Sequence, residues 1–179
     1  MRLISGFLLT AVGLGCSPGP GDPPIPFPAD AADHATELDP VCKPVAGAVP
    51  DVALGQGQSD YLPLADLETV QVEKGPQGGY HIWMAVRMKN LLRSGSRTVL
   101  TAVSPELART ISPYEVLFTY DPDEGGYCKL SGLRFRLDTD GVDYQPLLGK
   151  ELDVTAKVTD RAGDTGQDSR RVTLSTTIR

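Results

Sequence analysis

The chain has few of the residues on which several functional classes depend. Its 179 residues include two histidines, His81 and a His34 that lies in a proline-rich stretch, and this disfavours a histidine metal centre or a Ser-His-Asp triad. The net charge of −6 and the pI near 4.9 disfavour nucleic acid as a direct partner. The apolar run at residues 3–14 is shorter than the roughly 20 residues that a transmembrane helix needs.

The first sixteen residues, MRLISGFLLTAVGLGC, have the layout of an export signal. Arg2 supplies a positive start, residues 3–14 supply the apolar core, and the following SPGPGDPP cannot continue a helix. The small Gly15 directly before Cys16 resembles the lipobox of bacterial lipoproteins. Gly13 departs from that pattern, because the family usually has leucine or another aliphatic residue there. An ordinary secretory signal with a chance cysteine is the alternative.

The lipoprotein resemblance implies where the protein resides. In that family the cysteine thiol takes a diacylglyceryl group and becomes the new N-terminus after cleavage, so Cys16 is the expected lipidation site. Each buried methylene contributes about 0.8 kcal/mol, and two or three acyl chains anchor a protein durably to a bilayer. Ser17, rather than aspartate, follows the cysteine and implies the outer membrane. We therefore expect a lipid-anchored protein of the bacterial cell envelope, with the bilayer as a partner through Cys16.

The composition changes twice along the chain and predicts three parts. Residues 1–15 form the signal peptide to be cleaved, and residues 16–49 form a lipidated, proline-rich tether that is expected to be disordered. Nine prolines lie between positions 18 and 50, and proline favours an extended backbone. Residues 50–179 form the folded domain.

The three cysteines leave an even pair once Cys16 is assigned to lipid. An oxidising periplasm favours a disulfide between Cys42 and Cys128, which would join the tether to the domain. Two unpaired buried thiols are the alternative. A metal site has less support, since no CxxC motif or nearby histidine accompanies either residue.

The folded region alternates apolar and polar residues with a period of two, which predicts half-buried strands. Helix is nearly absent, and residues 105–110 predict a short turn. The strand candidates are residues 80–88, 133–137, 152–159 and 172–178, with weaker ones at 51–54, 69–73, 98–103 and 114–120. About seven or eight strands at this spacing predict an all-β, immunoglobulin-like antiparallel sandwich. The last two strands resemble the final hairpin of immunoglobulin-like modules in bacterial surface proteins, although no Cys-Trp-Cys spacing is present.

The segment GPQGGYHIW is the most distinctive string outside the leader. Its glycines permit positive φ and expose backbone N–H groups, so it is either a ligand loop that holds an anion or a tight hairpin. It is similar to loops of uncharacterised lipoproteins of soil deltaproteobacteria, a resemblance that implies no activity. The candidate ligand-loop residues are Gly75, Gln77, Gly78, Gly79, His81 and Trp83.

A run of carboxylates after residue 137 offers a weaker alternative. Asp138, Asp140 and Asp143 alternate around a glycine like part of a calcium loop, but Gly149 stands where an EF-hand needs a bidentate glutamate. We therefore predict no metal site and interpret the Asp140-Gly141 pair as a hairpin turn.

These observations favour a non-enzymatic binding or structural module that needs no cofactor. Its expected partner is an envelope protein or a glycan, and nucleic acid is not expected. One alternative is a hydrolase that uses paired carboxylates, for which the candidates are Asp121, Asp123, Asp138 and Asp140. Another is an accessory subunit of an envelope complex, which an exposed edge strand would indicate.

Overall fold

The computed structural model describes residues 42–179, and this part of the chain is built from β-strands. The leader, Cys16 and the tether as far as residue 41 lie outside the described residues. Within residues 42–179 no helix has the length and hydrophobicity needed to cross a bilayer. The strands are β1 (Asp51–Gln56), β2 (Leu62–Pro63), β3 (Glu68–Lys74), β4 (Tyr80–Lys89), β5 (Ser96–Ser104), β6 (Arg109–Phe118), β7 (Asp121–Pro122), β8 (Cys128–Arg136), β9 (Glu151–Thr159) and β10 (Thr165–Ile178).

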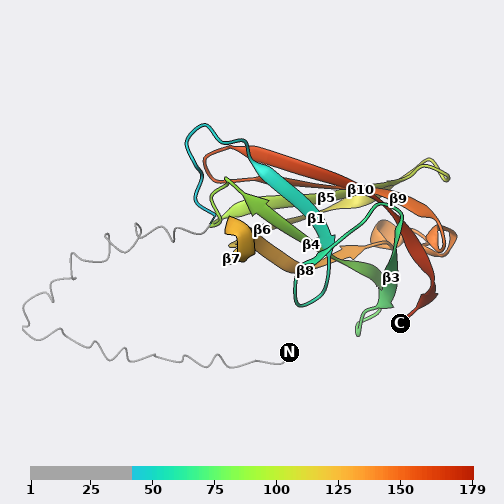
Figure 1. Cartoon of the computed structure of the whole chain (residues 1–179). Helices are drawn as coiled ribbons and strands as arrows, with labels where there is room; N and C mark the ends of the chain where they lie inside the picture. The colour runs from blue at the N-terminus through green and yellow to red at the C-terminus, as the bar shows by residue number, and fades with distance from the viewer. Residues whose placement is uncertain (1–41) are drawn as a thin grey trace, which may run out of the picture. The chain divides into compact units, whose positions relative to one another are not determined.

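The strands form two layers that β3 joins (Figure 1). One layer has the order β2-β1-β4-β8-β7, and the other has the order β10-β9-β5-β6. The start of β3 pairs in parallel with β10, while its last two residues pair antiparallel with β4. The all-β, immunoglobulin-like sandwich is therefore confirmed as the fold class, with ten strands and one parallel pair.

The core lies between the two layers and follows the predicted alternation. In β4 the side chains of Ile82, Met84, Val86 and Met88 are all buried, and β9 contributes another alternating apolar row. Burying a large aliphatic side chain is worth about 1.5 to 3 kcal/mol, so these rows hold the layers together. The turn at residues 105–108 connects β5 to β6, as expected.

The outer face of β4 is partly covered, which the alternation did not predict. The segment between β1 and β2 crosses this face. The N–H of Gly57 donates to the carbonyl of Trp83 at 3.2 Å, and the carbonyl of Gly57 accepts the N–H of Gly132 at 3.0 Å. A Cβ on Gly55 would lie only 2.4 Å from the ring of Tyr61, so this glycine lets the segment lie close to the sheet. Ala85, which alternation places on this outer face, is also buried.

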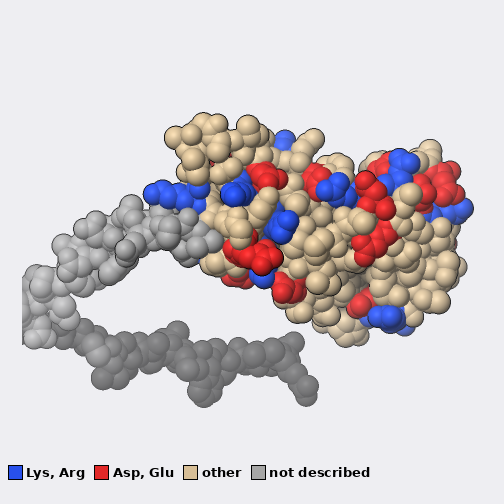
Figure 2. All heavy atoms as spheres, viewed as in Figure 1, with Lys and Arg blue, Asp and Glu red and all other residues tan. Residues whose placement is uncertain are grey.

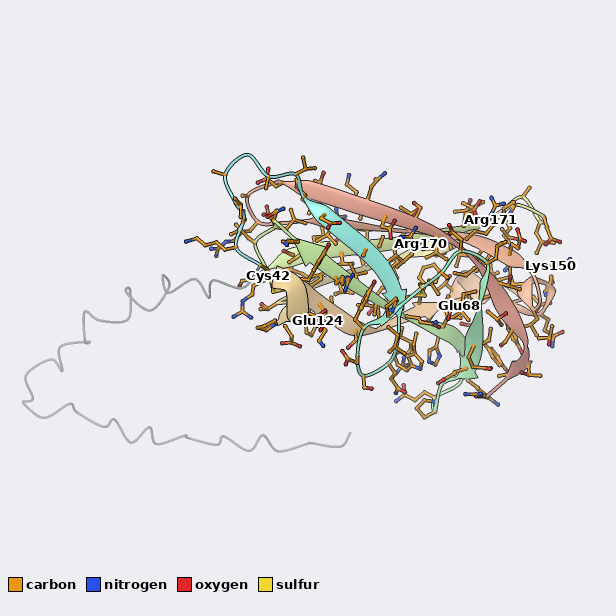
Figure 3. All side chains as sticks on the ribbon, viewed as in Figure 1. Cys42, Glu68, Glu124, Lys150, Arg170 and Arg171 are labelled. Carbon is orange, nitrogen blue, oxygen red and sulfur yellow. A yellow bond between two sulfur atoms is a disulfide. The ribbon has the colours of Figure 1, made fainter. Side chains whose placement is uncertain are left out.

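The predicted disulfide joins Cys42 to Cys128. Their Cα atoms lie 5.6 Å apart across a sequence separation of 86 residues, and both residues are buried. Cys128 begins β8, so the bond holds the segment before β1 against the end of that strand. Figure 3 shows Cys42 near Glu124 at one end of the sandwich, with Glu68 and Lys150 toward the other end.

Candidate functional site

A small cavity of about 190 Å³ lies between the β3–β4 turn and the end of β8. Glycine backbone, two arginines and a histidine surround it, and all of these groups bind anions. Its lining residues are Gln77, Gly78, Gly79, His81, Arg134 and Arg136. Four of them were predicted as ligand-loop residues from the sequence.

Strand register explains why the basic residues meet. On β4 and β8, His81 lies opposite Arg136, and Trp83 lies opposite Arg134. Residues two apart on a strand share a face, so both arginines and both rings point away from the core. On the other side of β4, His81 pairs with Glu73 of β3. Three strands therefore place their side chains around one histidine.

The β3–β4 turn closes one side of the cavity. The N–H of Gly75 donates to the carbonyl of Gly79 at 2.9 Å, and the N–H of Gly78 donates to that of Gly75 at 3.0 Å. Gly78 and Gly79 each have a φ of +83°, a conformation that other residues rarely adopt. A Cβ on Gly79 would lie 3.4 Å from a guanidinium nitrogen of Arg136, so glycine also allows the arginine to approach. The turn is thus the expected hairpin, and its glycines also line the cavity.

His81 is the most enclosed polar residue of the site, with 3% of its surface exposed. Its Nε2 is buried and has no hydrogen-bond partner among the residues that the structure describes. Burial, and next the charge of Arg134, hold the pKa of His81 below its ordinary value. The imidazole is therefore neutral at pH 7, and a ligand that reached Nε2 would give this atom a partner.

The residues that line the cavity include two arginines and no acid, and the carboxylates of Asp138 and Glu73 lie beside it. Arg136 donates to a single oxygen of Asp138, at 3.1 and 3.2 Å, and the Arg134 guanidinium lies 5.7 Å from the centre of the Trp83 ring. The Glu73 carboxylate accepts a hydrogen bond from the Trp83 indole at 2.9 Å. Within residues 42–179 Arg136 forms an ion pair with Asp138 and Arg134 forms none, so an oxyanion would give both guanidinium groups a further partner.

Sequence reasoning missed the two arginines. Both belong to the strand predicted over residues 133–137, whose alternation puts Arg134 and Arg136 on the polar face, where the structure has them. The signal that could have identified them is a pair of cations on one strand face in an acidic protein. Gly75 and Trp83 were also predicted as ligand-loop residues. Gly75 shapes the turn but does not line the cavity, and Trp83 lines a separate hollow beside it.

Two of the aspartates considered as calcium ligands bind other groups of the protein. Asp138 forms an ion pair with Arg136, and an oxygen of Asp143 accepts the N–H of Gln145 at 3.0 Å. The hairpin predicted at Asp140-Gly141 is wrong: these residues lie in a 3₁₀ turn (Thr139–Gly141), because the chain crosses there from β8 in one layer to β9 in the other. Among the described residues no group of three or more histidines, cysteines or acids could hold a metal ion.

The carboxylates of the hydrolase alternative are divided between two places. Asp123 lies in a cleft of about 330 Å³ and forms an ion pair with Lys129 at 3.2 Å, while Asp138 lies by the histidine cavity. Asp121 belongs to the short exposed strand β7. In the same cleft, the guanidinium of Arg87 lies 4.9 and 4.5 Å from the ring centres of Tyr61 and Tyr127.

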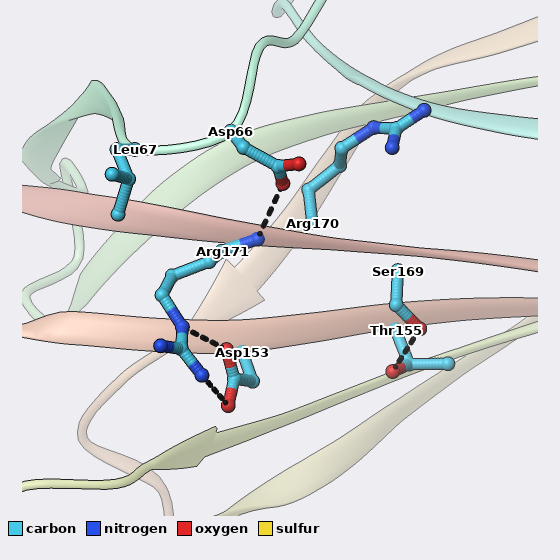
Figure 4. A pocket seen from close by; sticks show the side chains of 7 residues that line it. All are labelled: Asp66, Leu67, Asp153, Thr155, Ser169, Arg170 and Arg171. Carbon is cyan, nitrogen blue, oxygen red and sulfur yellow. Dashed lines mark hydrogen bonds and ion pairs between the residues drawn. The ribbon is translucent and has the colours of Figure 1, made fainter.

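A larger hollow of about 530 Å³ lies over β9 and β10. Figure 4 shows Arg171 bound by both oxygens of Asp153, at 2.6 and 2.9 Å, and the hydroxyls of Thr155 and Ser169 paired at 2.8 Å. The cations here already have carboxylate partners. Figure 2 shows the same pattern across the visible face, where acidic and basic side chains alternate in small groups.

Comparison with known proteins identifies no family for this chain. No protein-family model matches it, and a search of curated proteins finds no similar sequence.

Proposed function

We propose that the protein is a lipid-anchored lipoprotein of the bacterial outer membrane that acts as a non-enzymatic binding module for an anionic ligand. The observation that carries the binding role is the cavity lined by Arg134, Arg136 and glycine backbone, beside a His81 whose buried Nε2 has no partner among the described residues. Paired arginines and glycine backbone are groups that bind carboxylates, sulfates and phosphates.

The anchoring role is supported by the leader and by the cysteine pairing. Cys42 and Cys128 bond to each other, which leaves Cys16 as the third cysteine of the chain. A disulfide suits an oxidising compartment outside the cytoplasm. Cells expressing the protein should incorporate labelled palmitate into it, and the Cys16→Ser variant should not; label that persists in the variant would overturn the anchor.

The binding role is tested on the purified domain by calorimetry with sulfate and with acetate at pH 6. We expect both anions to bind, and Arg134→Gln or Arg136→Gln to weaken binding by about tenfold or more, because a charge-assisted bond is lost. Arg97→Gln is the matched control, since Arg97 pairs with Glu115 on β5 and β6. Equal affinities in all four proteins would exclude the cavity as the binding site.

A second role, as an accessory subunit of an envelope complex, is supported by strand β6. Within the described residues β6 pairs with β5 alone, so it forms one edge of its sheet. Near its end Leu117 is 69% exposed and Phe118 is 58% exposed. Exposed edge strands are sites where another chain adds a strand. Crosslinking in intact envelopes should capture a partner with the parent protein and lose it with Phe118→Lys.

A further inference from the structure

A second hollow of about 160 Å³ lies by Trp83 on the outer face of β4. It lies between the start of the β1–β2 segment and strand β3, with Trp83 at one side. Its lining includes Gln56, Gln58, Leu62, Gln71, Glu73 and Trp83. Three planar amides, a carboxylate and an indole make this surface unlike the arginine-rich cavity beside it.

The rings of His81 and Trp83 lie between the two hollows, and each ring lines one of them. The ring centres of His81 and Trp83 lie 4.7 Å apart, and His81 lines the first hollow while Trp83 lines the second. Arg134 lines the first hollow and lies over the Trp83 ring. Glu73 lines the second hollow and pairs with His81 across β3 and β4. A ligand that carries a ring and a charged group would have to extend past this ring pair to contact both hollows.

The polar groups of the second hollow are held in place by the fold. The amide nitrogen of Gln56 donates to Glu68 at 2.6 Å, and that of Gln71 donates to the backbone carbonyls of Val72 and Thr177, both at 2.8 Å. The indole N–H of Trp83 donates to Glu73. Their orientation is set before a ligand arrives, so binding costs less ordering of side chains. Planar amides and carboxylates bond to neighbouring hydroxyls, and an indole packs against the C–H face of a sugar.

The geometry points to an acidic sugar residue of a glycan as the ligand of the combined site, an inference that rests on the proposed anion-binding function. Its carboxylate lies with Arg134 and Arg136 beside His81, and its hydroxyl-bearing ring lies against Trp83 within reach of Gln58. Gln58 is exposed, so it is free to meet a ligand without disturbing the core. Each hollow is smaller than the roughly 300 Å³ of a typical small-molecule pocket, which suits one charged group and one ring.

Three probes separate this inference from the proposed function: glucuronate, glucose and acetate. Affinities are measured by calorimetry on the purified domain. Fluorescence of Trp83, the single tryptophan of the chain, shows where binding occurs. We expect glucuronate to bind about tenfold or more tightly than acetate or glucose, since it meets both hollows. Gln58→Ala should weaken glucuronate and leave acetate unchanged, while Arg134→Gln should weaken both.

The outcomes distinguish failure of the sugar inference from failure of the proposed anion-binding function. Equal affinities for glucuronate and acetate, both lost in Arg134→Gln, would overturn the sugar inference and leave the anion site in place. Glucose binding as tightly as glucuronate would also overturn it, because the carboxylate would then contribute nothing. Binding of none of the probes would overturn the inference together with the proposed function. Gln58 is on the surface, so the circular dichroism spectrum of Gln58→Ala should match that of the parent.

Discussion

The imidazole of His81 meets the indole of Trp83 edge-on, with the ring planes at 85° and the ring centres 4.7 Å apart. This contact places a neutral histidine and the single tryptophan side by side on the outer face of β4. Edge-to-face pairs are worth about 0.5 to 1.5 kcal/mol beyond the area that they bury. A change of charge on His81 therefore alters both the electrostatic potential in the anion cavity and the fluorescence of Trp83.

The first prediction concerns the stability of the domain at mildly acidic pH. Burial and then Arg134 hold the pKa of His81 below 6.5, with Arg136 acting in the same direction and with Glu73 and Asp138 opposing it. The unfolded chain therefore binds more protons than the folded one below pH 6.5, so the free energy of unfolding falls as the pH drops through this value. Urea unfolding between pH 7.5 and 5.5 should show this slope in the parent and a shallower one in His81→Gln. Identical slopes would contradict the neutral, buried histidine.

The second prediction concerns the pH dependence of anion binding. A bound anion favours protonated His81 and raises its pKa, so binding and protonation support each other. The dissociation constant for sulfate, whose own charge is constant in this range, should fall as the pH drops from 7.5 to 5.5. The His81→Gln variant should bind sulfate with little pH dependence. A parent protein whose affinity weakens in acid would argue against an anion next to His81.

The third prediction concerns the Cys42–Cys128 disulfide. Closing a loop of 86 residues stabilises the fold by about 4 to 5 kcal/mol in the chain-entropy model. The double variant Cys42→Ser with Cys128→Ser should lose stability of this order in chemical unfolding. Adding reductant should destabilise the parent and leave the double variant unchanged. A parent that shows no response to reductant would contradict the bond.

The fourth prediction concerns Asp160, which joins the β9–β10 turn to the chain after β4. One carboxylate oxygen accepts the N–H groups of Ala162 at 2.8 Å and Asp164 at 3.1 Å, and the other accepts that of Leu92 at 2.9 Å. Asp160 is buried, so Asp160→Ala leaves these donors without partners and should cost about 3 kcal/mol of unfolding free energy. Asp164→Ala, at an exposed position of the same turn, is the control and should change stability by about 0.5 kcal/mol or less.

Much of the fold follows from local pattern. The alternation in β4 and β9 predicted which side chains face the core, because successive residues of a strand point to opposite faces. The pairing of Cys42 with Cys128 followed from the number of cysteines and the expected compartment. The parallel pairing of β3 with β10 could not be predicted from the sequence, because a strand has the same alternation of residues whichever direction it runs.

Only part of the candidate site could be predicted from the sequence. Its glycine turn and His81 are close in the chain and were predicted together as a ligand loop. Arg134 and Arg136 lie more than fifty positions away, and only the register of β4 against β8 brings them to His81. That register depends on which apolar faces pack between the layers, which no local segment specifies.

The sequence by itself determined the alternation of buried and exposed residues, the cysteine pair, and the glycines that a positive-φ turn needs. These features depend on single residues or on near neighbours. Tertiary structure decided which strands became neighbours, so it alone brought Arg134 and Arg136 of β8 to the cavity beside His81. Strand pairing is a long-range outcome, because every strand offers the same backbone hydrogen bonds and only the packing of the whole core selects among partners.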